Sequence, residues 1–266
     1  MARISVIMGI YNCASTLVEA LDSLYAQTYQ DFKIILCEDG STDDTYEVAQ
    51  RYAQEHNNIV LLHNERNMGL NYTLNRCLEH VDTEYVARMD GDDISLPTRF
   101  EKELNFLDTH PEYSFVSTPM IHFDSDGEYK TRTSTKGGEP SSLDFLYGKS
   151  FCHAPLLIRS SAMIDVGGYS VSPYLLRVED RHLWYKLYMK NYKGCNLYDP
   201  LYMMRDDRNA KRRRTFLNRR NEAYMGLLYC KGFNLPWWHY PECIIIPLLK
   251  WLLPNWLYNL LHKTRE

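Results

Sequence analysis

Three carboxylates stand close together in the segment Arg88-Met-Asp-Gly-Asp-Asp93, directly after the strand-like stretch 84–87. Acids at the end of a strand make poor core residues, but their oxygens suit hard cations such as Mg²⁺ or Mn²⁺. Mg²⁺ commonly takes one or two protein carboxylates and leaves its other positions to substrate phosphates. The acidic cluster of Asp90, Asp92 and Asp93 therefore predicts a divalent-cation site that serves a phosphate-bearing substrate.

A second acidic run, Glu38-Asp-Gly-Ser-Thr-Asp-Asp44, follows another strand-like stretch. Part of it has a local explanation, because Asp-Gly favours a turn, Ser41 can cap a helix and the later acids suit the helix's positive end. Glu38 and Asp39 lack such an explanation, since acids at the tip of a strand should gain nothing from capping. A carboxylate there could accept the imide N–H of a uracil or a guanine edge, so we expect a nucleotide base beside them.

Other phosphate and metal motifs are excluded. An EF-hand loop fails because its sixth position would be Ser95 instead of glycine and because Pro97 would fall inside the loop. The connection 9–15 contains neither G-x-G-x-x-G nor G-K-[ST]. Diphosphate charge would therefore be met by a cation at the acidic cluster, helped by Arg66 or Arg88. A buried structural ion pair is the alternative for Arg88.

Short apolar runs alternate with helix-periodic stretches through the first 120 residues. This alternation predicts an α/β fold with βαβ crossovers and a mostly parallel sheet. Ligands of such sheets bind beyond the carboxyl ends of the strands, which here carry Tyr11 and Asn12, Glu38 and Asp39, and the acidic cluster. We expect strands at 3–9, 32–37, 59–63, 84–89 and 113–118, and helices at 14–27, 43–55, 69–81 and 97–109.

The pattern is less regular after residue 120. Residues 124–140 are rich in turn-forming residues and are expected to form a loop. A strand at 154–158, a short helix near 160–166 and a helix from 178 to about 190 are expected to follow.

Charge is distributed unevenly along the 266 residues. Residues 1–180 carry 14 Lys and Arg against 28 Asp and Glu, a net −14, whereas residues 181–266 carry 16 against 6, a net +10. An acidic catalytic half with a basic tail fits a protein that handles a metal and docks on something anionic. Nucleic acid is a poor partner, because the basic residues cluster in the tail and the expected site is acidic.

The seven cysteines are scattered and form no C-x-x-C pair, so neither a zinc site nor a disulfide framework is indicated. The N-terminal apolar run is too short for a signal peptide. We therefore expect a cytoplasmic setting.

The segment 241–262 is strongly apolar but is interrupted by Pro247, Lys250, Pro254 and Asn255, so a transmembrane helix is not expected. Its tryptophans, together with the basic run Lys211–Arg214, suit an interfacial helix on an anionic membrane leaflet. The alternative is that the segment packs back on the domain.

Six motifs follow one another in a fixed order along the chain. They are Ser5-Val-Ile with Tyr11-Asn12, Asp31-Phe-Lys-Ile-Ile with Glu38–Asp43, Asn67-Met-Gly-Leu70 with Asn75, Asp90–Asp93, Val166-Gly-Gly-Tyr169, and Glu179-Asp180 with Leu183-Trp184. Taken together, these motifs resemble the inverting glycosyltransferases of family 2, which have a GT-A type, Rossmann-like fold. The resemblance covers roughly residues 3–190. Gly9 and Glu38 depart from the residues that many members carry, and neither departure touches the chemistry that the resemblance implies.

The resemblance implies a role for each motif. Tyr11 and Asp39 would contact the nucleotide base, Asp90 would face the ribose and diphosphate, Asp92 would bind Mn²⁺ or Mg²⁺, and Asp180 would be the catalytic base. Chemistry supports this assignment, because a cation stabilises the leaving diphosphate and a carboxylate can take the acceptor's proton. Helix capping is the structural alternative for Asp180.

Six further residues complete the expected site. Asn12, Glu38 and Arg66 join the nucleotide-binding set, while Asp93, His153 and Glu179 are candidates for acceptor or accessory roles; a satisfied core position is the alternative for His153.

The sequence therefore predicts a GT-A domain over 1–200 and a basic, amphipathic helical tail over 201–266. Its predicted activity is metal-dependent, inverting transfer from a nucleoside-diphosphate sugar, with a UDP-sugar favoured, to a saccharide or lipid-linked hydroxyl. We expect a role in cell-surface polysaccharide synthesis at the inner face of the cell membrane. The alternatives are a nucleotidyltransferase acting on sugar phosphates, which should need a basic glycine-rich loop that is missing, and an inactive nucleotide- or glycan-binding module.

Overall fold

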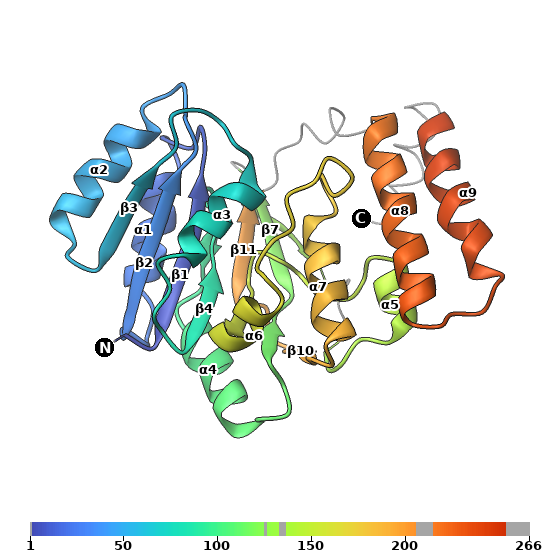
Figure 1. Ribbon diagram of the computed structural model, residues 1–266. Coiled ribbons are helices and arrows are strands. Elements are labelled where there is room, and N and C mark those ends of the chain that lie inside the picture. The colour runs from blue at the N-terminus through green and yellow to red at the C-terminus, as the bar shows by residue number, and fades with distance from the viewer. Residues whose placement is uncertain (1, 125–126, 133–136, 206–214, 254–266) are drawn as a thin grey trace.

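A seven-stranded sheet forms the centre of the molecule (Figure 1), and its strand order is β10-β6-β9-β4-β1-β2-β3. The computed structural model describes residues 2–124, 127–132, 137–205 and 215–253. Among these strands only β9 runs antiparallel to its neighbours, so the sheet is mostly parallel, as expected. The strands are β1 (Ile4–Ile10), β2 (Phe32–Glu38), β3 (Ile59–His63), β4 (Tyr85–Arg88), β6 (Phe115–Ser117), β9 (Leu157–Arg159) and β10 (Gly194–Asn196).

Helices cover both faces of this sheet, because nearly every residue of the central strands is apolar and needs burial on either side. Alternate residues of β1 enter different cores: Val6 and Met8 pack in the core that includes α1, whereas Ile7 packs in the core that includes α3. The first core also takes in α2 and α4, and the second takes in α6, α7 and α8. The helices are α1 (Leu17–Tyr25), α2 (Thr45–Glu55), α3 (Leu70–Leu78), α4 (Arg99–Thr109), α6 (Ser160–Asp165), α7 (Glu179–Met189) and α8 (Phe216–Gly232).

Each strand and helix that the sequence predicts as far as α7 is found, although β5 (Ile94–Ser95), β7 (Met120–Asp124), β8 (Gly127–Arg132) and α5 (Ser142–Leu146) are found in addition. Boundaries differ by a few residues; the first helix, for example, was expected over 14–27 and is found over 17–25. The late strand expected at 154–158 is β9, at 157–159.

The expectation of a loop over 124–140 is wrong in part. Residues Met120–Asp124 and Gly127–Arg132 form an antiparallel hairpin, β7 and β8. They belong to a second sheet of order β5-β11-β7-β8, in which β5 (Ile94–Ser95) and β11 (Tyr202–Arg205) also lie. Turn-forming residues dominate the local sequence, but pairing with distant strands decides the structure.

The C-terminal part folds as two helices, α8 and α9 (His239–Leu252), which lie next to each other beyond α7 (Figure 1). Gly226 lets them approach closely, because a Cβ there would lie 2.9 Å from the Cβ of Cys243. The Sγ atoms of Cys230 and Cys243 are 3.4 Å apart across the same contact. No helix within the described ranges is long and apolar enough to cross a membrane. A short helix, α5 (Ser142–Leu146), packs against α8.

Residues 254–266 and 206–214 lie outside the described residues, so the predicted tail is tested only in part. The boundary at residue 200 stays a prediction.

Candidate active site

The loops that follow β1 and β2 are bound to each other. The Asn12 N–H donates to Ser41 Oγ at 3.0 Å, and the Thr42 N–H donates to Asn12 Oδ1 at 2.8 Å. Asn12 has a φ of 49°. Gly40 has a φ of +67°, and a Cβ there would lie 2.5 Å from the backbone of Arg66. Three connections at the carboxyl edge of the sheet are thus held together, with the Tyr11 side chain exposed beside them.

Glu38 and Asp39 are buried at this edge, and both have structural partners. Asp39 Oδ1 accepts from the Met68 N–H at 2.9 Å and Asn64 Nδ2 at 2.7 Å, while its Oδ2 accepts from the Gly69 N–H at 2.9 Å. These backbone N–H groups belong to the two residues that precede α3, so the carboxylate holds the segment that leads into this helix. Helix capping does not explain Asp39, as expected, but a structural role in joining two loops does.

Glu38 is held as firmly. It accepts from the Ser41 N–H at 2.6 Å and contacts His63 Nδ1 at 2.7 Å. It shapes the turn that presents Ser41 to the first loop, so a direct contact with a nucleotide base stays a prediction.

The acidic cluster begins one residue beyond β4. Gly91 lets it approach the first loop, because a Cβ there would lie 2.8 Å from Cys13 Sγ. Asp93 is buried, accepts from the Arg205 N–H at 2.8 Å and lies against Tyr202. Burial first, and then the charges of Asp90 and Asp92, raise the pKa of Asp93 well above its usual value. Asp93 thus ties the cluster to β11.

Asp92 is exposed, whereas Asp90 is half-buried and Asp93 is buried. Its carboxylate has no hydrogen bond or ion pair with another described residue. Loss of hydration, followed by the nearby charge of Asp90, raises its pKa. Such a carboxylate fits a divalent cation, which would remove the repulsion. Within the described ranges no three Asp, Glu, His or Cys side chains cluster around one metal position, so substrate oxygens would complete the coordination.

Asp180 lies in the first turn of α7 and accepts its neighbour's Arg181 N–H at 2.7 Å. Burial is the largest influence on its carboxyl and raises the pKa, while the charges of Arg181 and Arg88 oppose it. A carboxylate with a raised pKa is a better proton acceptor than an ordinary one.

Arg88 links the acidic cluster to Asp180. Its buried guanidinium donates to Asp90 Oδ1, and its charge also acts on Asp180 and His153. The same two carboxylates act on the hydroxyl of Tyr169. Burial is the largest influence that raises the pKa of Tyr169, and the charges of Asp90 and Asp180 both add to that increase. The charges of two carboxylates that are 90 residues apart in the chain, Asp90 and Asp180, therefore act on the same guanidinium and the same phenol.

The ion pair expected as the alternative for Arg88 is present. Tyr169 was not among the predicted site residues, but it belongs to the Val166–Tyr169 motif, so the sequence contained a signal for its importance. Tyr202, whose hydroxyl accepts the Asp90 N–H at 3.2 Å, carries no local signal because it lies 112 residues away.

The remaining candidates differ in their surroundings. His153 Nε2 lies 2.9 Å from the Tyr169 hydroxyl, and burial lowers its pKa well below 6.5, so the ring is neutral beside Arg88. Glu179 has a buried Oε2 without a hydrogen-bond partner. Burial, followed by the charge of Asp180, raises the pKa of Glu179. The Arg66 side chain is exposed and has no partner among the described residues.

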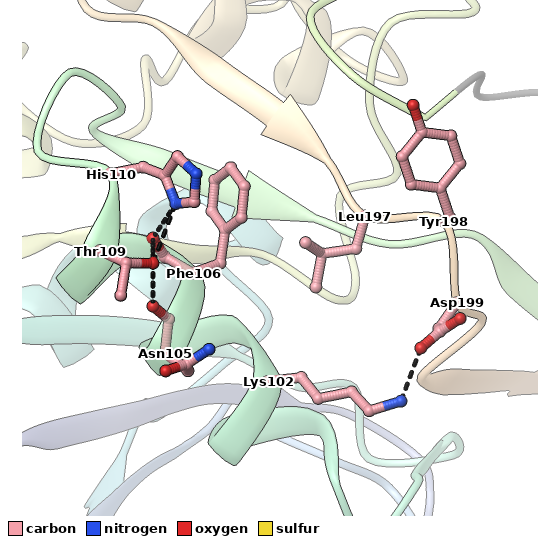
Figure 2. A pocket seen from close by; sticks show the side chains of 8 residues that line it. All are labelled: Lys102, Asn105, Phe106, Thr109, His110, Leu197, Tyr198 and Asp199. Carbon is pink, nitrogen blue, oxygen red and sulfur yellow. Dashed lines mark hydrogen bonds and ion pairs between the residues drawn. The ribbon is translucent and has the colours of Figure 1, made fainter.

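A surface pocket lies elsewhere, between α4 and the segment after β10 (Figure 2). Its walls include Lys102, Phe106, His110 and Tyr198, and none of the predicted site residues. Lys102 and Asp199 form an ion pair of 2.6 Å at its edge. The carboxylates described above, not this pocket, form the candidate active site.

Known proteins resemble this chain over most of its length. The model of the family described as Glycosyl transferase family 2 matches residues 5–167. The EpsE protein of Bacillus subtilis, classed by its name with the glycosyltransferases, is 38% identical over 264 residues, which are 99% of this chain and 94% of that protein. The amylovoran biosynthesis glycosyltransferase AmsE of Erwinia amylovora is 32% identical over 76% of this chain and 75% of its own length.

Solved structures share the fold. TarS of S. aureus in complex with UDP-GlcNAc superposes with a TM-score of 0.72 at 19% identity, covering 93% of this chain and 72% of that one. The mannosyltransferase PcManGT of Pyrobaculum calidifontis, in complex with GDP-Man and Mn²⁺, has a TM-score of 0.64 at 18% identity over 99% and 79%. The fold is thus of the GT-A type, as predicted, and the chain belongs to glycosyl transferase family 2 and is a glycosyltransferase.

Proposed function

We propose that this glycosyltransferase moves a sugar, with inversion, from a nucleoside-diphosphate sugar to the hydroxyl of a saccharide or lipid-linked acceptor. The observation that carries the proposal is the position of Arg88, whose guanidinium is paired with Asp90 of the acidic cluster while its charge also limits the rise that burial causes in the pKa of Asp180 in α7. Inverting transfer needs a leaving-group site and a base at opposite sides of one sugar, and we assign the first role to the acidic cluster and the second to Asp180.

The residues divide the reaction between them. Tyr11 and the segment around Asp39 would receive the base of the nucleotide, and Asp90 would face its ribose and diphosphate. Asp180 would accept the proton of the acceptor hydroxyl as its oxygen forms a bond to the anomeric carbon. The bond from that carbon to the diphosphate oxygen breaks at the same time, and the nucleoside diphosphate leaves.

Asp92 would hold a Mn²⁺ or Mg²⁺ ion, whose positive charge would stabilise the leaving diphosphate. Asp92 supports this role because its carboxylate reaches solvent and has no other described residue as a partner. The Mn²⁺ in the PcManGT complex is consistent with such an ion.

Relatives suggest the donor and acceptor classes. The E. coli protein WfaP, 27% identical over 76% of this chain and 77% of its own length, is named as a glucosyltransferase that uses UDP-Glc and GlcNAc-diphosphoundecaprenol. The TarS structure contains UDP-GlcNAc, and the name of AmsE assigns that protein to amylovoran biosynthesis. We therefore favour a UDP-sugar donor and a lipid-linked acceptor in cell-surface polysaccharide synthesis, at the cytoplasmic face of the membrane.

The exposed face of α9 supports attachment to that membrane. Its large apolar side chains include Ile245 at 51% and Leu249 at 55% exposure, and exposed tryptophans lie near both ends of the helix. Its one acid, Glu242, is occupied by His239 and Tyr147. Because residues 181–266 carry a net charge of +10, an anionic lipid surface fits this face better than a second copy of the chain does.

The central proposal is tested with a panel of UDP-, GDP- and dTDP-sugars in the presence and absence of Mn²⁺. We expect nucleoside diphosphate to be released from one of them and a glycosylated product to form when an acceptor is added. Release of inorganic pyrophosphate from a nucleoside triphosphate and a sugar phosphate would support the nucleotidyltransferase instead. Binding of nucleotide without any turnover would support the inactive module.

A further inference from the structure

The loop 169–178 joins the nucleotide side of the molecule to the C-terminal helices. On one side, Asn75 of α3 exchanges two hydrogen bonds with the backbone of Tyr169, of 2.7 and 2.8 Å. On the other side, the fully buried Asn221 of α8 donates to the carbonyls of Pro173 and Leu176, both at 3.1 Å. The loop runs directly into α7 and Asp180, so α8 helps to position the approach to the base.

Two tyrosines and an arginine lie where this loop meets α8. Tyr174 of the loop and Tyr224 of α8 have ring centroids 6.1 Å apart, and they remain 52% and 42% exposed. The guanidinium of Arg220 lies 4.3 Å from the centroid of Tyr174 and donates to the Pro173 carbonyl. Its Nε and Nη2 also donate to Asn221 Oδ1, at 3.2 and 3.0 Å. Arg220 has no carboxylate partner among the described residues, and its Nη1 remains available to a ligand.

This group lies on the same side of the molecule as Asp180. Farther along α8, the Tyr229 hydroxyl donates to the Arg181 carbonyl at 2.6 Å, and the Arg181 guanidinium lies over the Tyr229 ring. The loop, the first turns of α8 and the carboxyl ends of β1 and β2 all lie toward the upper edge in Figure 1. A ligand on Tyr174 and Tyr224 would therefore lie at the edge of the molecule at which α7 and Asp180 begin.

Exposed aromatic rings beside a guanidinium that has no carboxylate partner among the described residues are chemically suited to a sugar. The apolar C–H face of a pyranose packs on an aromatic ring, whose face is electron-rich, while a guanidinium donates hydrogen bonds to hydroxyl or phosphate oxygens at the sugar's edge. We propose that Tyr174, Arg220 and Tyr224 form an acceptor platform, on which the saccharide that carries the reacting hydroxyl is held. The proposal rests on the proposed function, since it names the acceptor side of the same site.

The test measures transfer to N-acetylglucosaminyl diphosphate carrying a short phenylalkyl chain, with the donor selected from the panel above. We expect Tyr174→Ala and Tyr224→Ala each to raise the KM for this acceptor by about tenfold, from the loss of one aromatic contact. The KM for the donor and the slow hydrolysis of the donor without acceptor should stay unchanged. Tyr174→Phe should keep most of the affinity, because the ring remains.

Tyr198→Ala is the matched control, since Tyr198 is an exposed tyrosine at the pocket of Figure 2, away from the loop and α8. It should leave the acceptor KM unchanged. An unchanged acceptor KM in both Tyr174→Ala and Tyr224→Ala, with normal donor hydrolysis, would overturn the platform alone. Absence of donor turnover in the unmodified protein would overturn the proposed function, and the platform with it. Weaker binding of another protein, with unchanged acceptor KM, would assign the surface to a protein partner instead.

Discussion

At the scale of single residues, the site depends on how charges are balanced around Arg88. Burial raises the pKa of Asp180, and the positive charge of Arg88 limits that rise. Asp90 is paired with the same guanidinium, and Asp92 reaches solvent without a described partner. Similar carboxylates thus have different surroundings, which suits them to different roles.

Replacement of Asp180 by Asn should separate binding from chemistry. We expect Asp180→Asn to keep nucleotide affinity and to lower the rate of transfer by about 10²- to 10⁴-fold, the usual contribution of a general base. Transfer rates and calorimetric titration with nucleoside diphosphate measure the two effects. Undiminished transfer would remove the assignment of Asp180 as the base.

The pH dependence of transfer provides an independent check of Asp180. The base must be ionised, so the rate should fall as the pH falls through the pKa of Asp180. Because burial raises that pKa above the ordinary value of 3.8, we expect the fall to begin at a higher pH than for an exposed aspartate. A rate that stays constant down to pH 4 would contradict this expectation.

Replacement of Asp92 should uncouple nucleotide binding from the cation. In the unmodified protein, Mn²⁺ should strengthen binding of nucleoside diphosphate, and in Asp92→Ala this effect should disappear, together with transfer. Calorimetry with and without Mn²⁺ measures the coupling. Asp82→Ala, at an exposed acid paired with Lys33, is the control and should behave as the unmodified protein does. Equal coupling in both variants would place the cation elsewhere.

At the scale of secondary-structure elements, connections position the site more than strands do. The loops after β1 and β2 and the segment before α3 are joined through Asn12, Ser41, Asp39 and the backbone contact at Gly40. Polar residues follow the carboxyl ends of β1, β2 and β3. These contacts hold the three connections together at one edge of the sheet.

Gly40→Ala tests the importance of this close contact. The added Cβ would lie 2.5 Å from the Arg66 backbone, so we expect a loss of about 1–3 kcal/mol in the free energy of unfolding and a higher donor KM. Gly148→Ala is the matched control, since Gly148 has nearly the same φ, +68°, but no atom within 4 Å of its Cβ position. Urea unfolding of both variants separates the clash from the backbone strain that they share. Equal losses would show that the contact has no effect.

At the scale of the whole molecule, the sequence predicts the parallel sheet well and the second sheet poorly. Strong local periodicity in 3–63 defines β1 to β3 and their helices, because each βαβ unit is encoded within a short segment. β5 and β11 are only two and four residues long and pair across about 110 residues, so no local pattern reveals them. The motifs predict the acidic cluster and a base at Asp180, an assignment that stays a prediction. The structural partners of Asp39 and the contact of Tyr202 with Asp90 depend on tertiary contacts, so no local pattern reveals them.

Attachment to a membrane is also a property of the whole molecule. The double variant Ile245→Glu, Leu249→Glu places charge on the exposed face of α9. We expect its binding to phosphatidylglycerol-containing vesicles to fall at least about tenfold, because two apolar side chains that would enter the membrane are lost. Co-sedimentation measures this. Ile164→Glu, on α6 and 64% exposed, is the control and should bind vesicles normally. If the double variant sediments as the unmodified protein does, α9 is not the docking surface; loss of a dimer in light scattering would assign the face to a second copy.

The hydrogen bonds from Asn221 to the loop before Asp180 have a consequence for evolution and engineering. The matched family region, 5–167, ends before this loop, whereas α8 lies entirely after it. We therefore expect that specificity for the acceptor could change through substitutions on α8, while the residues that bind the donor remain the same. Chimeric enzymes that exchange only this helix and its partner loop would be the natural way to redirect the product.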